Sequence, residues 1–143
     1  MSPLDIINEN TIGQAKGTAV EEMVQKNFQG ETMEVGLYLA MAWQAQREGF
    51  PEISEALRTI AWEEAQHAVR YALLNGLISE STKENIEKML KGEQMANRGK
   101  RESAVKAREG GLDETHEVFD DTSRDEARHA RTLDGLLRRY FGA

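Results

Sequence analysis

Two copies of a Glu-x-x-His motif hold the side chains of this chain that are best suited to chemistry. The motif stands at residues 64–67 as Glu-Ala-Gln-His and at residues 126–129 as Glu-Ala-Arg-His. A glutamate and a histidine three residues apart lie one turn apart on the same side of a helix, so both can reach one metal ion. Carboxylate and imidazole ligands without a thiolate favour iron or manganese.

A further glutamate precedes each motif at the same distance along the chain. It stands in a Gly-Glu-Thr-Met context at residues 30–33 and in a Gly-Glu-Gln-Met context at residues 92–95. The whole set repeats at one constant offset, because positions 31, 64 and 67 recur as positions 93, 126 and 129. This repeat predicts two copies of a helix pair, each with one Glu and one Glu-x-x-His. The six candidate metal ligands are Glu31, Glu64, His67, Glu93, Glu126 and His129.

Apolar residues at alternating spacings of three and four predict long amphipathic helices around these motifs. In the helix that holds the first motif, the expected inward face consists of Ile53, Leu57, Ile60, Glu64, His67, Tyr71 and Leu74. Pro51 suits the first turn of a helix, Gly76 suits a helix C-terminus, and residues 81–84 (Ser-x-x-Glu) form a capping box. Each helix would be about 40 Å long. We expect a lead-in at residues 1–17 and a single domain at 18–143, with helices at about 18–48, 51–75, 82–108 and 113–140.

The candidate ligands interrupt the apolar faces of these helices. An ionised carboxylate buried without a partner is costly, and two histidines cannot compensate four carboxylates, whereas two divalent cations would. In the helix at 82–108, Asn97 and Lys100 also interrupt the apolar face, and the sequence offers no explanation for them. His116 has no partner at motif spacing, so we expect it to be exposed.

Composition excludes several other classes of site and partner. The net charge of −7 argues against a nucleic-acid partner. Without cysteine, this chain can form no disulfide, thiolate zinc site or cysteine-bound iron centre. No apolar run is long enough to span a membrane, and the first 30 residues lack the core of a signal peptide, so we expect a cytoplasmic protein.

A Glu from each of two helices and a Glu-x-x-His from each of two others is the ligand pattern of ferritin-like bundles with two metal ions. From about Met23 onward the sequence resembles the rubrerythrin family, and it is closest to the short, sulerythrin-like members. The resemblance implies an all-α, ferritin-like four-helix bundle that holds two iron ions and reduces hydrogen peroxide. Tyr38, seven residues after Glu31, matches a tyrosine that the family places beside its metals, so it is a tentative catalytic residue.

The sequence departs from that family in two ways. The family usually carries a four-cysteine rubredoxin domain, so a chain without cysteine would need a separate rubredoxin-like electron donor. The family also places a seventh ligand, a glutamate, three residues after the one that matches Glu93, and that position is Ala96 here. The counterpart of Ala96 in the first repeat is Glu34, which is therefore a candidate seventh ligand.

The connection between the second and third helices is short for a ferritin-like order of helices. Residues 76–81 would reach about 20 Å when fully extended, which is less than the length of the bundle. The chain therefore forms either an up-down-up-down bundle or a domain-swapped bundle shared by two chains. The family resemblance favours the swapped homodimer.

Three functions fit this ligand set. The first is a di-iron peroxidase, the second a ferroxidase or iron-handling protein, and the third a di-manganese protein with catalase-type activity, which needs no electron donor. Hydrogen peroxide and oxygen are both candidate oxidants.

Overall fold

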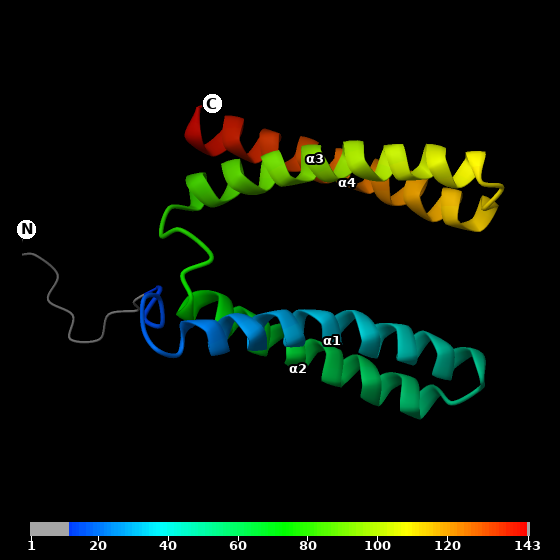
Figure 1. Cartoon of the computed structure of the whole chain (residues 1–143), viewed down its shortest axis with the longest axis horizontal. Helices are drawn as coiled ribbons and strands as arrows, with labels where there is room; N and C mark the ends of the chain where they lie inside the picture. Colours follow the sequence, from blue (N-terminus) through cyan, green and yellow to red (C-terminus); the bar gives the residue numbers. More distant parts are fainter. Residues whose placement is uncertain (1–11, 143) are drawn as a thin grey trace, which may run out of the picture. The chain divides into compact units, whose positions relative to one another are not determined.

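The computed structural model describes residues 12–142, and within them the chain forms four α-helices and no strand (Figure 1). This confirms the all-α class. The chain divides into two compact units, one ending at Glu80 and the other beginning at Ser81, and the prediction of a single domain at 18–143 stays a prediction. The helices are α1 (Glu21–Arg47), α2 (Pro51–Leu74), α3 (Thr82–Glu109) and α4 (Asp113–Phe141).

Each unit is a hairpin of two helices, which we call the first hairpin (α1 and α2) and the second hairpin (α3 and α4). Pro51 stands in the first turn of α2, where its missing N–H would have no helical partner. The Ser81 hydroxyl caps α3 by accepting a hydrogen bond from the Glu84 backbone N–H at 3.3 Å. These local signals place the helix ends within three residues of the expected bounds.

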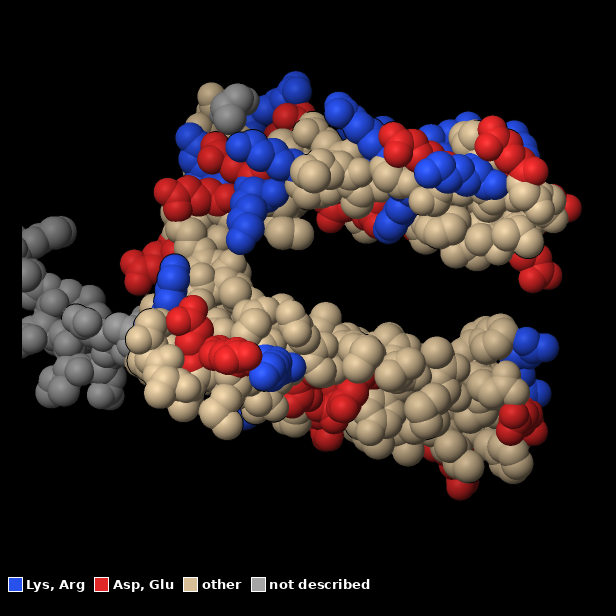
Figure 2. Space-filling model, viewed as in Figure 1, with Lys and Arg blue, Asp and Glu red and all other residues tan. Residues whose placement is uncertain are grey.

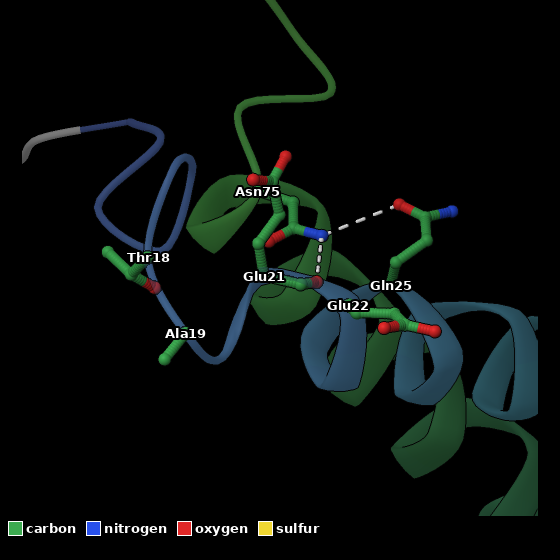
Figure 3. A pocket seen from close by; sticks show the side chains of 6 residues that line it. All are labelled: Thr18, Ala19, Glu21, Glu22, Gln25 and Asn75. Carbon is green, nitrogen blue, oxygen red and sulfur yellow. Dashed lines mark hydrogen bonds between the residues drawn. The ribbon is translucent and has the colours of Figure 1, made fainter.

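The lead-in packs on the C-terminal end of α2 (Figure 3). Of this predicted segment, residues 12–17 form turns and residues 1–11 lie outside the described residues. The backbone N–H groups of Gly13 and Ala15 donate to the carbonyls of Leu73 and Leu74, both at 2.8 Å. These bonds satisfy carbonyls that have no partner within the helix. The lead-in thus serves as a cap for α2.

Gly76 allows this cap to form. Its backbone φ is +60°, and a Cβ at this position would lie 3.2 Å from the Gly13 Cα. Beside it, the Asn75 side-chain amide donates to the Glu21 carbonyl at 3.0 Å (Figure 3). A hollow of about 450 Å³ next to this contact is lined by Thr18, Ala19, Glu21, Glu22, Gln25 and Asn75.

Small side chains form the closest contact within each hairpin. In α2 the buried residues Ser54, Ala61 and Ala68 are spaced by seven, and the Ser54 hydroxyl donates to the Ala42 carbonyl at 2.8 Å. The expected inward face of α2 was therefore wrong by one residue, because each buried residue directly follows a member of that face. The expected face consisted of Ile53, Leu57, Ile60, Glu64, His67, Tyr71 and Leu74. Small residues take the central line because they let two helix backbones approach closely, and the larger side chains border it.

The same line recurs in the second hairpin, at the offset of the sequence repeat. There the His116 Nδ1 lies 2.7 Å from the Ala104 carbonyl, which it can reach as a donor, just as Ser54 reaches Ala42. His116 is half-buried, so the expectation that it is exposed is wrong. Its correspondence to Ser54 in the repeat marks His116 as a residue of the contact between α3 and α4.

Both hairpins expose large apolar side chains, more of them in the first. Figure 2 shows a broad uncharged face along the first hairpin and many more charged side chains along the second. Within the part of the chain that the structure describes, no helix combines the length and the apolar character that crossing a membrane requires. Exposed side chains in the first hairpin include Met33, Leu37, Met41, Trp43 and Trp62.

Candidate metal centre

The first hairpin brings together one of the two expected ligand triads. Glu31 comes from α1, and Glu64 and His67 come from consecutive turns of α2. The His67 Nδ1 lies 2.9 Å from the Glu64 Oε2 and 3.6 Å from the Glu31 Oε2. One ligand atom from each residue lies within 4.8 Å of the other two. The three side chains therefore converge on one point, as a metal site requires.

The second hairpin repeats this geometry. The His129 Nδ1 lies 3.0 Å from the Glu126 Oε2 and 3.5 Å from the Glu93 Oε2, and the three ligand atoms again lie within 4.8 Å of one another. The corresponding distances in the two triads are nearly equal. The internal repeat of the sequence is thus a structural repeat of the site.

Both triads fit a divalent cation. Protein ligands bind such ions at about 2.1 Å, so two ligand atoms on opposite sides of an ion are about 4.2 Å apart. Two ligand atoms at a right angle about the ion are about 3 Å apart, and the distances of 2.9–3.6 Å from the histidine nitrogens to the carboxylate oxygens are close to that span. The glutamates are mostly buried, with 14–19% of each side chain exposed, whereas the histidines are about half exposed. Two carboxylates and one imidazole per triad suit iron or manganese.

The carboxyl groups of the first triad lie close enough to shift each other's pKa in opposite directions. A hydrogen bond between Glu31 and Glu64 raises the pKa of Glu31, with partial burial acting in the same direction, and lowers the pKa of Glu64. The hydrogen bond to Glu64 also raises the pKa of His67, and the charges of both carboxylates add to this effect. The three side chains of this triad are thus close enough to influence one another's protonation.

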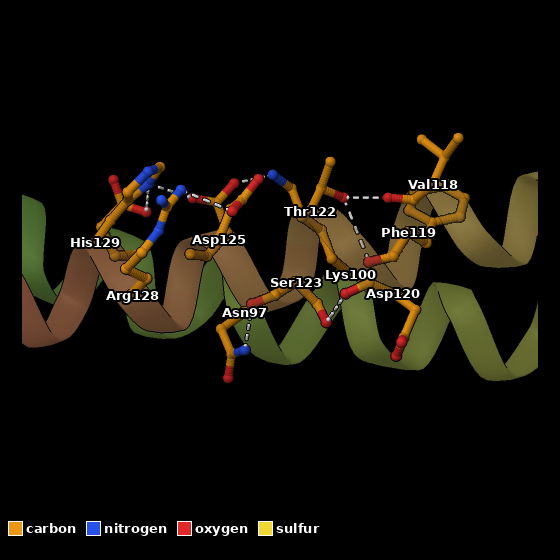
Figure 4. Close-up of polar contacts among 12 residues, drawn as sticks. Asn97, Lys100, Val118, Phe119, Asp120, Thr122, Ser123, Asp125, Arg128 and His129 are labelled. Atoms are coloured by element: carbon orange, nitrogen blue, oxygen red, sulfur yellow. Dashed lines mark hydrogen bonds and ion pairs between the residues drawn. The ribbon is translucent and has the colours of Figure 1, made fainter.

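A lysine side chain contacts the second triad, and the spacing of the ligand motifs did not predict this contact. The Lys100 ammonium group on α3 (Figure 4) donates to the Glu126 Oε1 on α4. The Lys100 side chain is 34% exposed. Lys100 stands seven residues after Glu93, as Tyr38 stands seven residues after Glu31. Positions 38 and 100 differ by the same offset as the ligands, so comparing the two repeats position by position would have shown that a lysine replaces the tyrosine.

Further polar contacts account for the polar stretch of α3 that the sequence left unexplained. The Asn97 amide donates to the Ser123 carbonyl at 2.7 Å (Figure 4), and Arg101 pairs with Asp120. Arg124 donates to the other Asp120 oxygen at 2.7 Å. Polar side chains thus bridge α3 and α4 between the triad and the turn that joins the two helices.

The two remaining candidate site residues lie on α1, outside the triad. Tyr38 is half-buried, two turns after Glu31. Glu34 is exposed and is not among the three residues whose ligand atoms converge, although its charge contributes to raising the pKa of Glu31. The roles of Tyr38 as a catalytic residue and of Glu34 as a seventh ligand stay predictions.

A hollow of about 440 Å³ opens beside the first triad. It is lined by Glu31 and His67 of the triad and by Arg70, Tyr71 and Leu74 of α2. Among the described residues, no hydrogen bond or ion pair joins Arg70 to the triad. The hollow leaves one side of the ligand atoms open.

Comparisons with known proteins match nearly the whole length of this chain. The Rubrerythrin family model matches residues 22–83, a span that includes the first triad. An uncharacterized protein of Methanocaldococcus jannaschii is 64% identical over 138 residues, which cover 96% of this chain and 98% of that protein. Reverse rubrerythrin-1 of Clostridium acetobutylicum is 45% identical over 137 residues, which cover 94% of this chain and 76% of that protein.

Proposed function

Because this chain belongs to the rubrerythrin family, whose fold is a ferritin-like helical bundle, we propose that it is a non-haem di-iron oxidoreductase that reduces hydrogen peroxide. The observation that carries this proposal is the pair of equivalent triads, each of which gathers two carboxylates and one imidazole within 4.8 Å. A single such triad on a helical surface is weak support, because acidic groups often lie close together without a metal. Two triads with matching internal distances, one in each repeat, point to a pair of metal ions.

Each triad would hold one iron ion through its two carboxylates and its imidazole. When bound, the two iron ions would supply the two electrons needed to reduce the O–O bond of hydrogen peroxide. The chain positions the ions through Glu31, Glu64, His67, Glu93, Glu126 and His129. Glu34 is the proposed seventh ligand, and Tyr38 is proposed to place a hydroxyl group, which can donate or accept a proton, beside the ions.

The electrons would come from another protein. This chain has no cysteine and therefore cannot bind iron as a rubredoxin does. We propose a separate rubredoxin-like donor as its partner, and a cytoplasmic location stays a prediction. The same lack of cysteine keeps one alternative open, which is a di-manganese centre with catalase-type activity, because that reaction needs no donor.

A homodimer with exchanged hairpins also stays a prediction. Its support is the short connection at residues 76–81 and the large apolar side chains that each hairpin leaves exposed, since contiguous exposed apolar surface often marks an interface. Light scattering coupled to size-exclusion chromatography is the measurement. A monomeric mass would rule out the exchange.

The test of function begins with the metal content of protein purified without added metal. The reduced protein is then mixed anaerobically with hydrogen peroxide and, separately, with oxygen, and the oxidation of the iron is followed by absorbance. We expect two irons per chain and much faster oxidation by peroxide. Faster oxidation by oxygen would instead support a ferroxidase, and two manganese ions with evolution of oxygen would support a catalase. A folded protein that binds no metal would contradict all three functions.

A further inference from the structure

The two triads share their ligands but differ in the charges around them. In the first hairpin the position seven residues after the α1 ligand is the neutral Tyr38, and the position three residues after it is the acidic Glu34. In the second hairpin the same two positions are the cationic Lys100 and the neutral Ala96. Both differences make the second triad the more positive of the two.

Lys100 acts directly on a candidate ligand. Its ammonium group contacts the Glu126 Oε1, while the Glu126 Oε2 lies 3.0 Å from the His129 Nδ1. Both oxygens of this carboxylate are therefore engaged by groups of the protein itself. The Oε2 could turn to a metal ion together with His129, whereas the Oε1 could bind the ion only if Lys100 moved away.

The first triad has no equivalent of this contact. There the Glu64 carboxylate interacts with Glu31 and His67, which are themselves ligands. Arg70 lines the neighbouring hollow, but no hydrogen bond or ion pair among the described residues joins it to the triad. Within that part of the chain, a cation that reaches the first triad therefore meets no ammonium or guanidinium group in contact with its ligands.

We propose that Lys100 makes the two metal positions unequal, so that the first metal ion binds at Glu31, Glu64 and His67 and the second binds more weakly at Glu93, Glu126 and His129, beside Lys100. This proposal rests on the proposed function in one respect, which is that both triads bind metal. A divalent ion and an ammonium group about 5 Å apart repel each other even in water, by an amount that corresponds to about a tenfold change in affinity. Lys100 would thus order the loading of the centre.

The test is a titration of the metal-free protein with cobalt(II) in competition with a chelator, followed by the visible absorption of the bound ion. We expect two binding steps in the unaltered protein. The variants His67→Ala and His129→Ala assign the steps: loss of His67 should remove the tighter step and loss of His129 the weaker one.

Lys100→Met removes the charge and keeps much of the length of the side chain. We expect the second step to become about tenfold tighter and the first step to change by less than about twofold. Lys100→Arg, which keeps the charge, should retain the two separate steps. The matched control is Lys106→Met, because Lys106 is an exposed lysine on the same helix and should leave both steps unchanged.

Circular dichroism of each metal-free variant checks that the helices are intact. If Lys100 only joins α3 to α4, Lys100→Met would lower the unfolding midpoint of the metal-free protein and leave both cobalt affinities unchanged, which would overturn the proposal. Equal affinities at the two positions of the unaltered protein, or weaker binding in Lys100→Met, would overturn it as well. An unaltered protein that binds no cobalt would overturn the proposed function together with this inference, so the two failures are distinguishable.

Discussion

The two hairpins place their candidate metal ligands in the same geometry but in different surroundings. Helices α1 and α2 carry four basic residues, which are Lys26, Arg47, Arg58 and Arg70, whereas α3 and α4 carry thirteen. At five positions near the triads, the first hairpin has an apolar or aromatic residue and the second hairpin has a polar or charged one. The differing pairs, written first hairpin then second, are Val35 and Asn97, Tyr38 and Lys100, Leu39 and Arg101, Ala61 and Ser123, and Trp62 and Arg124.

This comparison separates the requirements of the site from those of the packing around it. The ligands need a fixed spacing along each helix, and both hairpins keep it. The contact between the two helices of a hairpin needs small or hydrogen-bonded side chains, which Ser54 provides in one hairpin and His116 in the other. The remaining positions vary because either an apolar contact or an ion pair can hold two helices together.

The largest effect that we expect follows from removing a ligand charge. Glu64→Gln should lose at least one metal ion per chain and slow the oxidation of the iron by peroxide by about 100-fold or more. Even the removal of a residue that only hydrogen-bonds to a metal ligand lowers metal affinity or activity by about 10–100-fold. Metal analysis and stopped-flow absorbance are the measurements. Glu63→Gln is the matched control, because Glu63 is the exposed preceding residue and should behave like the unaltered protein. Full metal content in Glu64→Gln would contradict the assignment of this ligand.

A smaller effect should follow from making the second hairpin resemble the first. Asn97→Val introduces the residue type found at position 35 and removes the hydrogen bond to the Ser123 carbonyl. Because Asn and Val have similar helix propensities, the loss should come from the hydrogen bond, at about 1 kcal/mol of unfolding free energy. Urea unfolding of the metal-free protein measures it. An unchanged midpoint would show that this contact contributes nothing to holding α3 against α4.

The smallest effects concern pH, and they should differ between the hairpins. The pKa of His67 is raised in the folded first hairpin, so the protonated form stabilises the fold. That stabilisation is fully present below pH 6.5, the ordinary value, and is lost as the pH rises through the folded pKa. In the metal-free protein, the unfolding free energy should fall as the pH rises through this pKa, and His67→Gln should remove that fall. Unfolding curves recorded at a series of pH values are the measurement. A pH dependence identical to that of the unaltered protein would contradict the role of His67.

The second hairpin should respond at the acid end instead. Partial burial of Asp120 acts to raise its pKa, but the hydrogen bonds and charges of Arg124 and Arg101 outweigh it, and the pKa is lowered. The stabilisation is therefore present above pH 3.8 and is lost as the pH falls through the folded pKa. Asp120→Asn should unfold at lower urea concentrations than the unaltered protein at neutral pH, and the difference should shrink in acid. A difference that stays constant with pH would assign the effect to packing.

The sequence alone was sufficient for the helices, their ends and the internal repeat. These features depend on neighbours a few residues away: the spacing of apolar residues, the proline at position 51 and the serine cap at position 81. The pairing of the glutamate and the histidine within each motif followed from the same local geometry, since Glu-x-x-His spans one turn of a helix. Glu31 and Glu93 join these pairs from the other helix of each hairpin, and that depends on how the two helices pack.

Only the tertiary structure decided which side of each helix makes the closest contact and what the other polar residues do. A shift of one residue along a helix turns the contact line by about 100°, and this rotation depends on the partner helix, so Ser54 and Ala61 rather than Ile53 and Ile60 lie at the centre of the first hairpin. The pairing of Lys100 with Glu126 and of His116 with Ala104 joins residues 26 and 12 positions apart. Such pairs form because the two helices pack at one particular rotation about their axes. The spacing of apolar residues within one helix is not enough to predict that rotation.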